Sequence, residues 1–205
     1  MKLYYTPTSP YVRKVLVAAH ELGLAERITT ELLRPSPMAP SAVLTRANPL
    51  SKIPALVLDD GETLFDSPVI CEYLDSVAAS GGGRRLVPAS GPERWQALRL
   101  QALCDGILDA GVLVFYERHH RPPELQWASW VDGQSMKVVQ GLDALEALVP
   151  DFGGEFGIGQ ITAGAALGWL SFRNIVGDWR ATRPRLAAWF DEISARPSMK
   201  ATEPH

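Results

Sequence analysis

A run of small and turn-forming residues divides the sequence into two parts with different patterns. Residues 78–92 read AASGGGRRLVPASGP, and so much Gly, Pro and Ser between periodic segments is typical of a linker. Before this run, short β-like stretches alternate with helical patterns, and after it every pattern is helical. The chain is therefore expected to form an α/β domain over residues 1–78, a linker over 79–91 and an all-helical domain over 92–205.

The first part begins with a β-α-β pattern. A strand is expected at residues 2–5. It leads into a helix that opens at Ser9 and is closed by Gly23, with apolar residues at helical spacing between them. A second strand is expected near residues 27–33. The Pro- and Ser-rich residues 34–41 then read as a loop before a short helix.

A hairpin and a helix complete the first part. Residues 55–58 and 63–65 flank an Asp-Gly turn, which favours two antiparallel strands. A helix follows at once, beginning with the residues Asp66-Ser67-Pro68. The expected order of elements is therefore β-α-β-α-β-β-α.

The second part is predicted to be helical throughout. Amphipathic patterns indicate helices over residues 95–114 and 131–149. A third helix, apolar nearly all round, is expected from Thr162 to about residue 176, with Thr162 as its N-cap. Pro184 suits the first turn of a last helix.

Charge and hydropathy exclude several classes of partner. The net charge of −3 at pH 7 gives no basic footprint for nucleic acid or for an anionic membrane. No apolar stretch near the N-terminus suits a signal peptide, and no later run could span a bilayer. We therefore expect a cytoplasmic protein without nucleic-acid or membrane partners.

The cysteines and histidines show no pattern typical of a disulfide framework or a metal site. Cys71 and Cys104 each lie in a helical segment, which favours buried, reduced thiols. The four histidines lack the Cys or carboxylate spacing of zinc sites. No metal is therefore expected, and the adjacent His119 and His120 are interpreted as a solvated helix end.

Three places in the first part could bind a ligand. Ser9, before Pro10, is either a simple N-cap or a donor at a helix end that could hold a thiolate. Pro54, directly before a strand, marks either an edge turn or a cis peptide that leaves the Ile53 backbone able to pair with a peptide-like ligand.

The third place is Asp66-Ser67, again at a helix start before a proline. The two residues are either a cap or a site for an amino-acid head group. In the second interpretation, Ser67 and the helix amides hold a carboxylate, and Asp66 accepts from an ammonium group.

Taken together, these residues resemble the glutathione-binding half of the glutathione S-transferase superfamily, of the bacterial type with an active-site serine. The most specific part is NPLSKIP at 48–54, followed after the hairpin by Asp66-Ser67 and by EYL at 72–74. The resemblance extends over nearly the whole chain. It implies a thioredoxin-like N-terminal domain, an all-α C-terminal domain and a homodimer.

The resemblance also implies roles for individual residues. Ser9 would donate to the glutathione sulfur, Ile53 beside cis-Pro54 would pair with the cysteinyl backbone, and Asp66 with Ser67 would hold the γ-glutamyl head. Lys52 would lie near the glycine carboxylate, the alternative being an exposed salt bridge. Glutathione would be a co-substrate. Residues 9–12 (SPYV) also resemble a glutaredoxin motif with both cysteines replaced, so disulfide exchange through a protein thiol is not expected at this site.

The second domain would bind a small electrophile. Its pocket residues vary within the family, and the candidates by position are Tyr116, His119, Trp169, Phe172 and Arg173, with core or dimer contacts as the alternative. The hypothesis is a detoxifying transferase whose bound thiolate attacks an electrophile, or reduces a peroxide or a glutathionyl adduct. The alternative is a non-catalytic binding or regulatory protein of the same fold.

Overall fold

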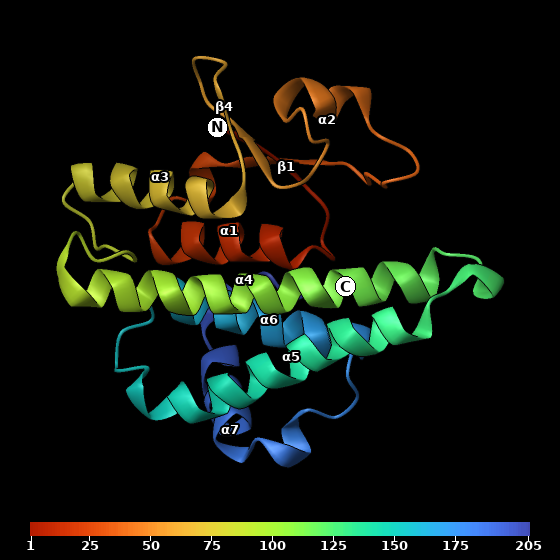
Figure 1. The fold of residues 1–205 in the computed structure, drawn as a ribbon. Helices are drawn as coiled ribbons and strands as arrows, with labels where there is room; N and C mark the ends of the chain where they lie inside the picture. Colours follow the sequence, from red (N-terminus) through yellow and green to blue (C-terminus); the bar gives the residue numbers. More distant parts are fainter. The chain divides into compact units, whose positions relative to one another are not determined.

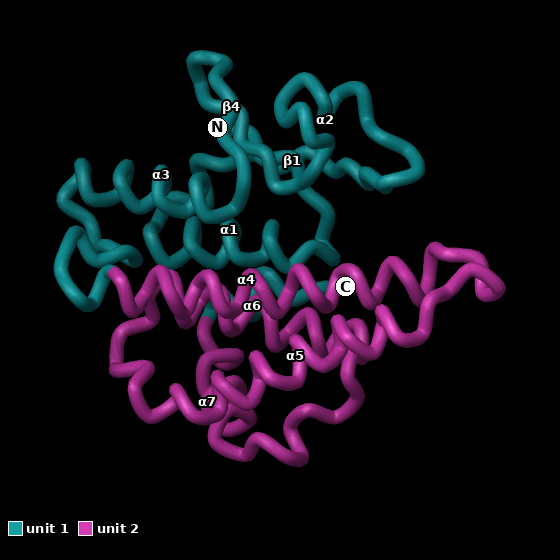
Figure 2. The backbone as a smooth tube through the Cα atoms, in the orientation of Figure 1, with its two compact units in different colours: residues 1–94, 197–205 teal, residues 95–196 magenta.

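The computed structural model describes residues 1–205, and the chain divides into two compact units (Figure 2). Unit 1 comprises residues 1–94 and 197–205, and unit 2 comprises residues 95–196. All four strands belong to unit 1. None of the helices combines the length and apolar character needed to cross a membrane.

Unit 1 is built on a four-stranded mixed sheet with the order β2-β1-β3-β4. Strand β1 (Lys2–Tyr5) runs parallel to β2 (Thr29–Leu32) and antiparallel to β3 (Ala55–Val57), which pairs in turn with antiparallel β4 (Thr63–Leu64). Strand β2 starts later than expected because residues 25–27 form a short 3-10 turn. The predicted order of strands and helices is confirmed.

Three helices flank this sheet. Helix α1 (Pro10–Glu21) packs against α3 (Ser67–Ser80), and α2 (Ala42–Ala47) lies on the other side of the sheet (Figure 1). Successive strand residues point to opposite faces. Accordingly Tyr4 packs in a cluster with Leu44 and Ala47 of α2.

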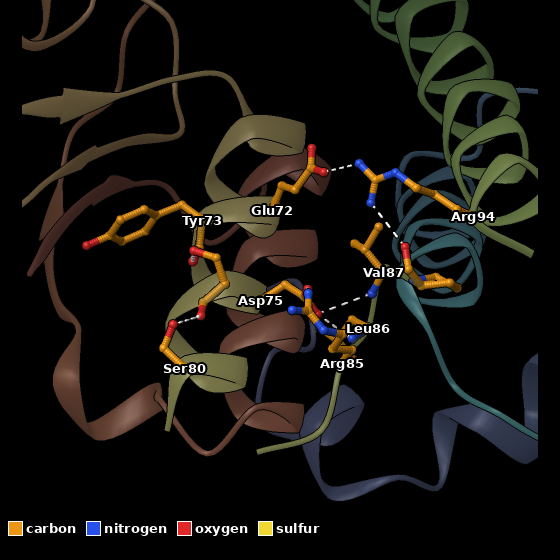
Figure 3. Close-up of polar contacts among 10 residues, drawn as sticks. Glu72, Tyr73, Asp75, Ser80, Arg85, Leu86, Val87 and Arg94 are labelled. Carbon is orange, nitrogen blue, oxygen red and sulfur yellow. Dashed lines mark hydrogen bonds and ion pairs between the residues drawn. The ribbon is translucent and has the colours of Figure 1, made fainter. Parts of the chain in front are cut away.

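The residues after α3 are tied back onto that helix (Figure 3). Asp75 of α3, only 2% exposed, accepts hydrogen bonds from the backbone amides of Leu86 and Val87 and pairs with Arg85 at 3.2 Å. Arg94 forms an ion pair with Glu72 of the same helix. The Gly- and Ser-rich residues after α3 therefore form a loop that hydrogen bonds and ion pairs attach to α3.

The C-terminal segment belongs to unit 1, although we expected residues 92–205 to form one helical domain. Its short helix α8 (Pro197–Lys200), which we did not predict, packs against α1. The buried Arg13 donates from Nη2 to the Met199 carbonyl at 3.1 Å, and the Ser198 hydroxyl donates to Glu21 at 2.6 Å. These bonds satisfy polar groups on α1 and explain where the segment packs.

Unit 2 is helical, as predicted. Its helices are α4 (Gly91–His119), which begins in unit 1, α5 (Ala128–Leu148), α6 (Ile158–Arg173) and α7 (Pro184–Ser194). Short 3-10 turns across the chain span Ala25–Arg27, Pro123–Leu125, Val149–Asp151 and Arg180–Thr182. His119 and His120 are exposed at the end of α4, which confirms their interpretation as a helix end.

The expected start of α6 was wrong. The helix begins at Ile158, and Thr162 lies one turn inside it with no exposed surface. The Thr162 hydroxyl donates to the carbonyl of Ile158 at 2.7 Å, a bond within the helix that a threonine can make instead of capping. The residue before the helix, Gly157, forms no side-chain cap.

Candidate functional site

The register of the sheet brings the three candidate segments to one edge. Tyr4 near the end of β1 pairs with Ala55 at the start of β3, and Leu56 pairs with Leu64 at the end of β4. The chain therefore leaves β1 toward Ser9, enters β3 from Pro54 and leaves β4 toward Asp66 at the same edge. Sequence patterns predicted each segment separately, whereas the strand pairing shows that all three lie at one edge of the sheet.

Ser9 is the N-cap of α1, as one of its two interpretations required. Its Oγ accepts a hydrogen bond from the amide of Val12 at 3.3 Å, and its backbone is extended. No group within the chain accepts a hydrogen bond from the Ser9 hydroxyl. Because a hydroxyl both accepts and donates, the capping bond leaves the Ser9 proton able to bind a ligand.

The Ile53-Pro54 peptide bond is cis, as one of its interpretations required. Neither the amide nor the carbonyl of Ile53 is bonded within the chain. The preceding turn is held by buried Asn48, whose side chain donates to the Lys52 carbonyl at 2.9 Å and accepts from the Leu50 amide at 3.0 Å. The Ile53 backbone is therefore presented with both hydrogen-bonding groups available.

The side chain of Lys52 is exposed and forms no ion pair within the chain. The alternative interpretation, an exposed salt bridge, is therefore not observed, because no carboxylate of the chain pairs with Lys52. Its expected place near a ligand carboxylate stays a prediction.

Asp66 and Ser67 begin α3 without capping it. Asp66 occupies the N-cap position, but its side chain makes no hydrogen bond to the helix, so the interpretation as a simple cap was wrong for this residue. Ser67 is only 1% exposed, and its hydroxyl has no hydrogen-bond partner in the chain. A negative ligand group at this helix start would find amide and hydroxyl donors together.

The backbone at this helix start has a further feature that the sequence did not reveal. The Phe65-Asp66 peptide bond is cis, although Asp66 is not a proline. Such bonds are rare and have no residue signature, so no sequence signal could have indicated this one.

Two family models match the chain. They are described as the glutathione S-transferase N-terminal domain, over residues 8–77, and the glutathione S-transferase C-terminal domain, over residues 128–192. The chain belongs to the glutathione S-transferase family. The first model covers all three segments at the sheet edge of this transferase-family protein, and the second covers most of unit 2.

Relatives of this glutathione S-transferase family member span its whole length. The uncharacterized GST-like protein YibF of Escherichia coli K12 is 33% identical over 207 residues, which cover 100% of this chain and 98% of YibF. A glutathione transferase family member from Pseudomonas fluorescens Pf-5, solved with bound glutathione, is 48% identical, with a TM-score of 0.96 and coverage of 100% and 98%.

A second structure of a glutathione transferase family member from the same organism contains bound S-(propanoic acid)-glutathione. It is 46% identical to this chain, with a TM-score of 0.91 and full coverage of both chains. These matches confirm the predicted fold class, a small α/β domain with a helical C-terminal domain.

Four of the five candidates in the second domain lie around the ring of Phe115, which was not predicted as a site residue, and the fifth, Phe172, contacts Arg173. Phe115 on α4 stacks on His119 with ring centroids 4.5 Å apart and meets buried Trp169 of α6 edge-on at 6.3 Å. The guanidinium of Arg173 lies 4.6 Å from the centre of the Phe115 ring and 4.7 Å from that of Phe172. Phe115 could have been found one helical turn before His119.

Proposed function

We propose that this protein is a glutathione-dependent transferase that stabilises the thiolate of bound glutathione for attack on a small electrophile. The observation that carries the proposal is the Ser9 hydroxyl, which accepts from the Val12 amide at 3.3 Å and retains its own proton for a ligand. The family and the glutathione-bound structure of a 48% identical protein support glutathione as the ligand.

Each of the three segments at the sheet edge suits one part of glutathione, the tripeptide γ-glutamyl-cysteinyl-glycine. The free amide and carbonyl of Ile53, beside cis-Pro54, suit the cysteinyl backbone. Asp66 and Ser67 suit the ammonium and carboxylate of the γ-glutamyl head, because one accepts and the other donates. Exposed Lys52 suits the glycine carboxylate.

Thiolate stabilisation explains why no protein cysteine is needed. A thiol with a pKa of about 8.5 is mostly protonated at neutral pH, and lowering that pKa by about two units makes the thiolate the main species. A donated hydrogen bond from Ser9 and the positive end of α1 both favour the charged form. The thiol proton goes to solvent, and the thiolate sulfur forms a bond to an electrophilic atom. In a substitution the leaving group departs with the electron pair of the broken bond; in an addition the π-electron pair moves to a neighbouring atom of the electrophile, which takes up a proton from solvent.

The bound ligand of one relative fits this reaction class. S-(propanoic acid)-glutathione, present in the 46% identical structure, carries a propanoic acid group on the glutathione sulfur. Peroxide or glutathionyl-adduct reduction uses the same thiolate and stays within the proposal. A binding protein with little turnover is the second candidate, and the retained Ser9 donor favours catalysis over it.

Ser9→Ala tests the proposal. We expect the ultraviolet absorbance of bound glutathione thiolate at neutral pH to fall, whereas glutathione binding stays nearly intact. Ser41→Ala is a matched control, because Ser41 caps α2 by the same bond, from the Leu44 amide at 3.3 Å. Each substitution should cost about 1 kcal/mol of stability as a lost cap. An unchanged thiolate signal in Ser9→Ala would show that Ser9 is a cap only.

Turnover separates the two candidate functions. A screen of aryl halides, peroxides and glutathionyl adducts should give glutathione-dependent turnover of at least one class if the protein is an enzyme. Glutathione binding without turnover of any class would favour the binding protein.

We propose a homodimer in the cytoplasm as the working form, acting in detoxification. The family supports the dimer, and the two buried cysteines, which form no disulfide, suit a reducing compartment. The mass of the native protein in solution, against 22.4 kDa for one chain, tests the dimer.

A further inference from the structure

Arg173 lies in unit 2 in an unusual setting for a charged side chain. Its guanidinium carbon is 4.6 Å from the Phe115 ring centre and 4.7 Å from the Phe172 ring centre. Its Nε is buried without a hydrogen-bond partner. No carboxylate or carbonyl of the chain accepts a hydrogen bond from this arginine, so the only groups of the chain that contact its charge are aromatic rings.

Other arginines of unit 2 show what is missing at Arg173. Arg180 also lies over two rings, those of Trp179 at 5.3 Å and Phe190 at 5.2 Å, but it pairs with Asp191 at 2.8 Å. Arg183, which is buried and whose Nε also lacks a partner, pairs with Asp143 at 2.6 Å. Arg173 therefore differs from these two arginines, because it packs against aromatic rings as Arg180 does but has no carboxylate partner.

The surroundings of Arg173 disfavour its charge. Desolvation by burial lowers the pKa of the Arg173 guanidinium, and no neighbouring carboxylate opposes that effect. Only Nε of Arg173 is buried without a partner. The terminal nitrogens Nη1 and Nη2 are not, so a molecule from solution can reach them. A partly desolvated cation with an open donor edge gains more from an anion than a fully hydrated one does.

We infer that Arg173, with Phe115 and Phe172, forms a binding site for a small organic acid. The guanidinium edge would hold the carboxylate by two parallel hydrogen bonds, a geometry that arginine provides and lysine does not. Contact with the two rings restrains the guanidinium. His119 and Arg173 both lie against Phe115, so the exposed ring of Phe172 is the surface available to the apolar part of the acid. The ligand class is therefore a carboxylate with an apolar or aromatic body.

Arg173 and Phe172 are also candidates for the electrophile pocket, so the inference names a class of second substrate and in that respect rests on the proposed function. Because the site lies within unit 2, acid binding is measured without glutathione and can fail separately from glutathione binding. The probes are 3-phenylpropanoate and its neutral isostere 3-phenylpropanamide, compared by ligand-observed NMR titration at fixed, low ionic strength. The wild-type protein should bind the acid about tenfold more tightly than the amide, as expected for one charge-assisted pair.

Arg173→Gln should remove this preference for the acid and leave amide binding nearly unchanged. Arg180→Gln is the matched control, because Arg180 stacks on rings but is already paired, and the preference should persist in that variant. Arg173→Lys, which keeps the charge without the fork, should retain only part of the preference.

Two outcomes would overturn the inference. One is equal binding of acid and amide by the wild-type protein, a result that needs no variant and therefore does not depend on how a variant folds. The other is a folded Arg173→Gln protein, with unchanged circular dichroism, that keeps the full preference. Either result would mean that Arg173 only covers the aromatic rings.

Discussion

The hydroxyl of Ser67 has no hydrogen-bond partner in the chain, although the residue is only 1% exposed. Its oxygen is not among the fully buried polar atoms that lack a partner, so a ligand can reach it. A carboxylate at the start of α3 would give the hydroxyl an acceptor and would also meet the amides of the first helical turn. The proposed γ-glutamyl site therefore accounts for a polar group that the fold itself does not use.

Ser67→Ala should weaken glutathione binding with little effect on stability, because no bond within the protein is lost. A hydrogen bond to a charged group contributes about 1.5–3 kcal/mol, which corresponds to roughly a tenfold or larger rise in the dissociation constant. Ser76→Ala is the control on the same helix, since the exposed Ser76 hydroxyl donates to the Tyr73 carbonyl at 2.7 Å. Equal losses of affinity in both variants would contradict the assignment.

At the scale of elements, the start of α7 depends on a side chain from α5. The N-cap residue Arg183 provides no side-chain cap, and Glu146 takes that role from a distance. Its Oε2 accepts from the Leu186 amide at 2.7 Å, and its Oε1 accepts from Arg185 Nε at 3.0 Å. Burial by itself raises the pKa of Glu146, but these hydrogen bonds outweigh burial, and the pKa is lowered.

The lowered pKa of Glu146 predicts a pH-dependent contribution to stability. A carboxyl whose pKa is lower in the folded state stabilises the fold above its unfolded pKa of about 4.3, and this contribution is lost as the pH falls through the folded value. The difference in unfolding free energy between wild type and Glu146→Gln, from urea titrations, should be largest near neutral pH and should shrink below about pH 4.3.

A control separates this effect from a general change of charge. Glu155→Gln removes the same charge at an exposed position where the side chain makes no hydrogen bond within the chain. Its effect on stability should be small at every pH. A pH-independent difference for Glu146→Gln would contradict the capping role.

At the scale of the whole molecule, the sequence predicted the order of strands and helices in unit 1, whereas the roles of the site residues stay predictions. Helical spacing and turn residues carry local information, so the helix starts at Ser9 and Ser67 could be predicted. The cis bond at Phe65-Asp66 and the packing of residues 197–205 on α1 depend on contacts distant in sequence. Thr162 was wrongly predicted as an N-cap because a threonine hydroxyl can either accept a hydrogen bond from an amide at a helix start or donate one to a carbonyl inside the helix.

The central claim is that one edge of the unit 1 sheet forms a glutathione site. The most direct test is calorimetric titration of the intact protein with glutathione, beside the dipeptide Cys-Gly, which lacks the γ-glutamyl head. We predict saturable binding of one glutathione per chain and much weaker binding of Cys-Gly, because Asp66 and Ser67 would then have no ligand group to hold. Absence of saturable glutathione binding would contradict the claim.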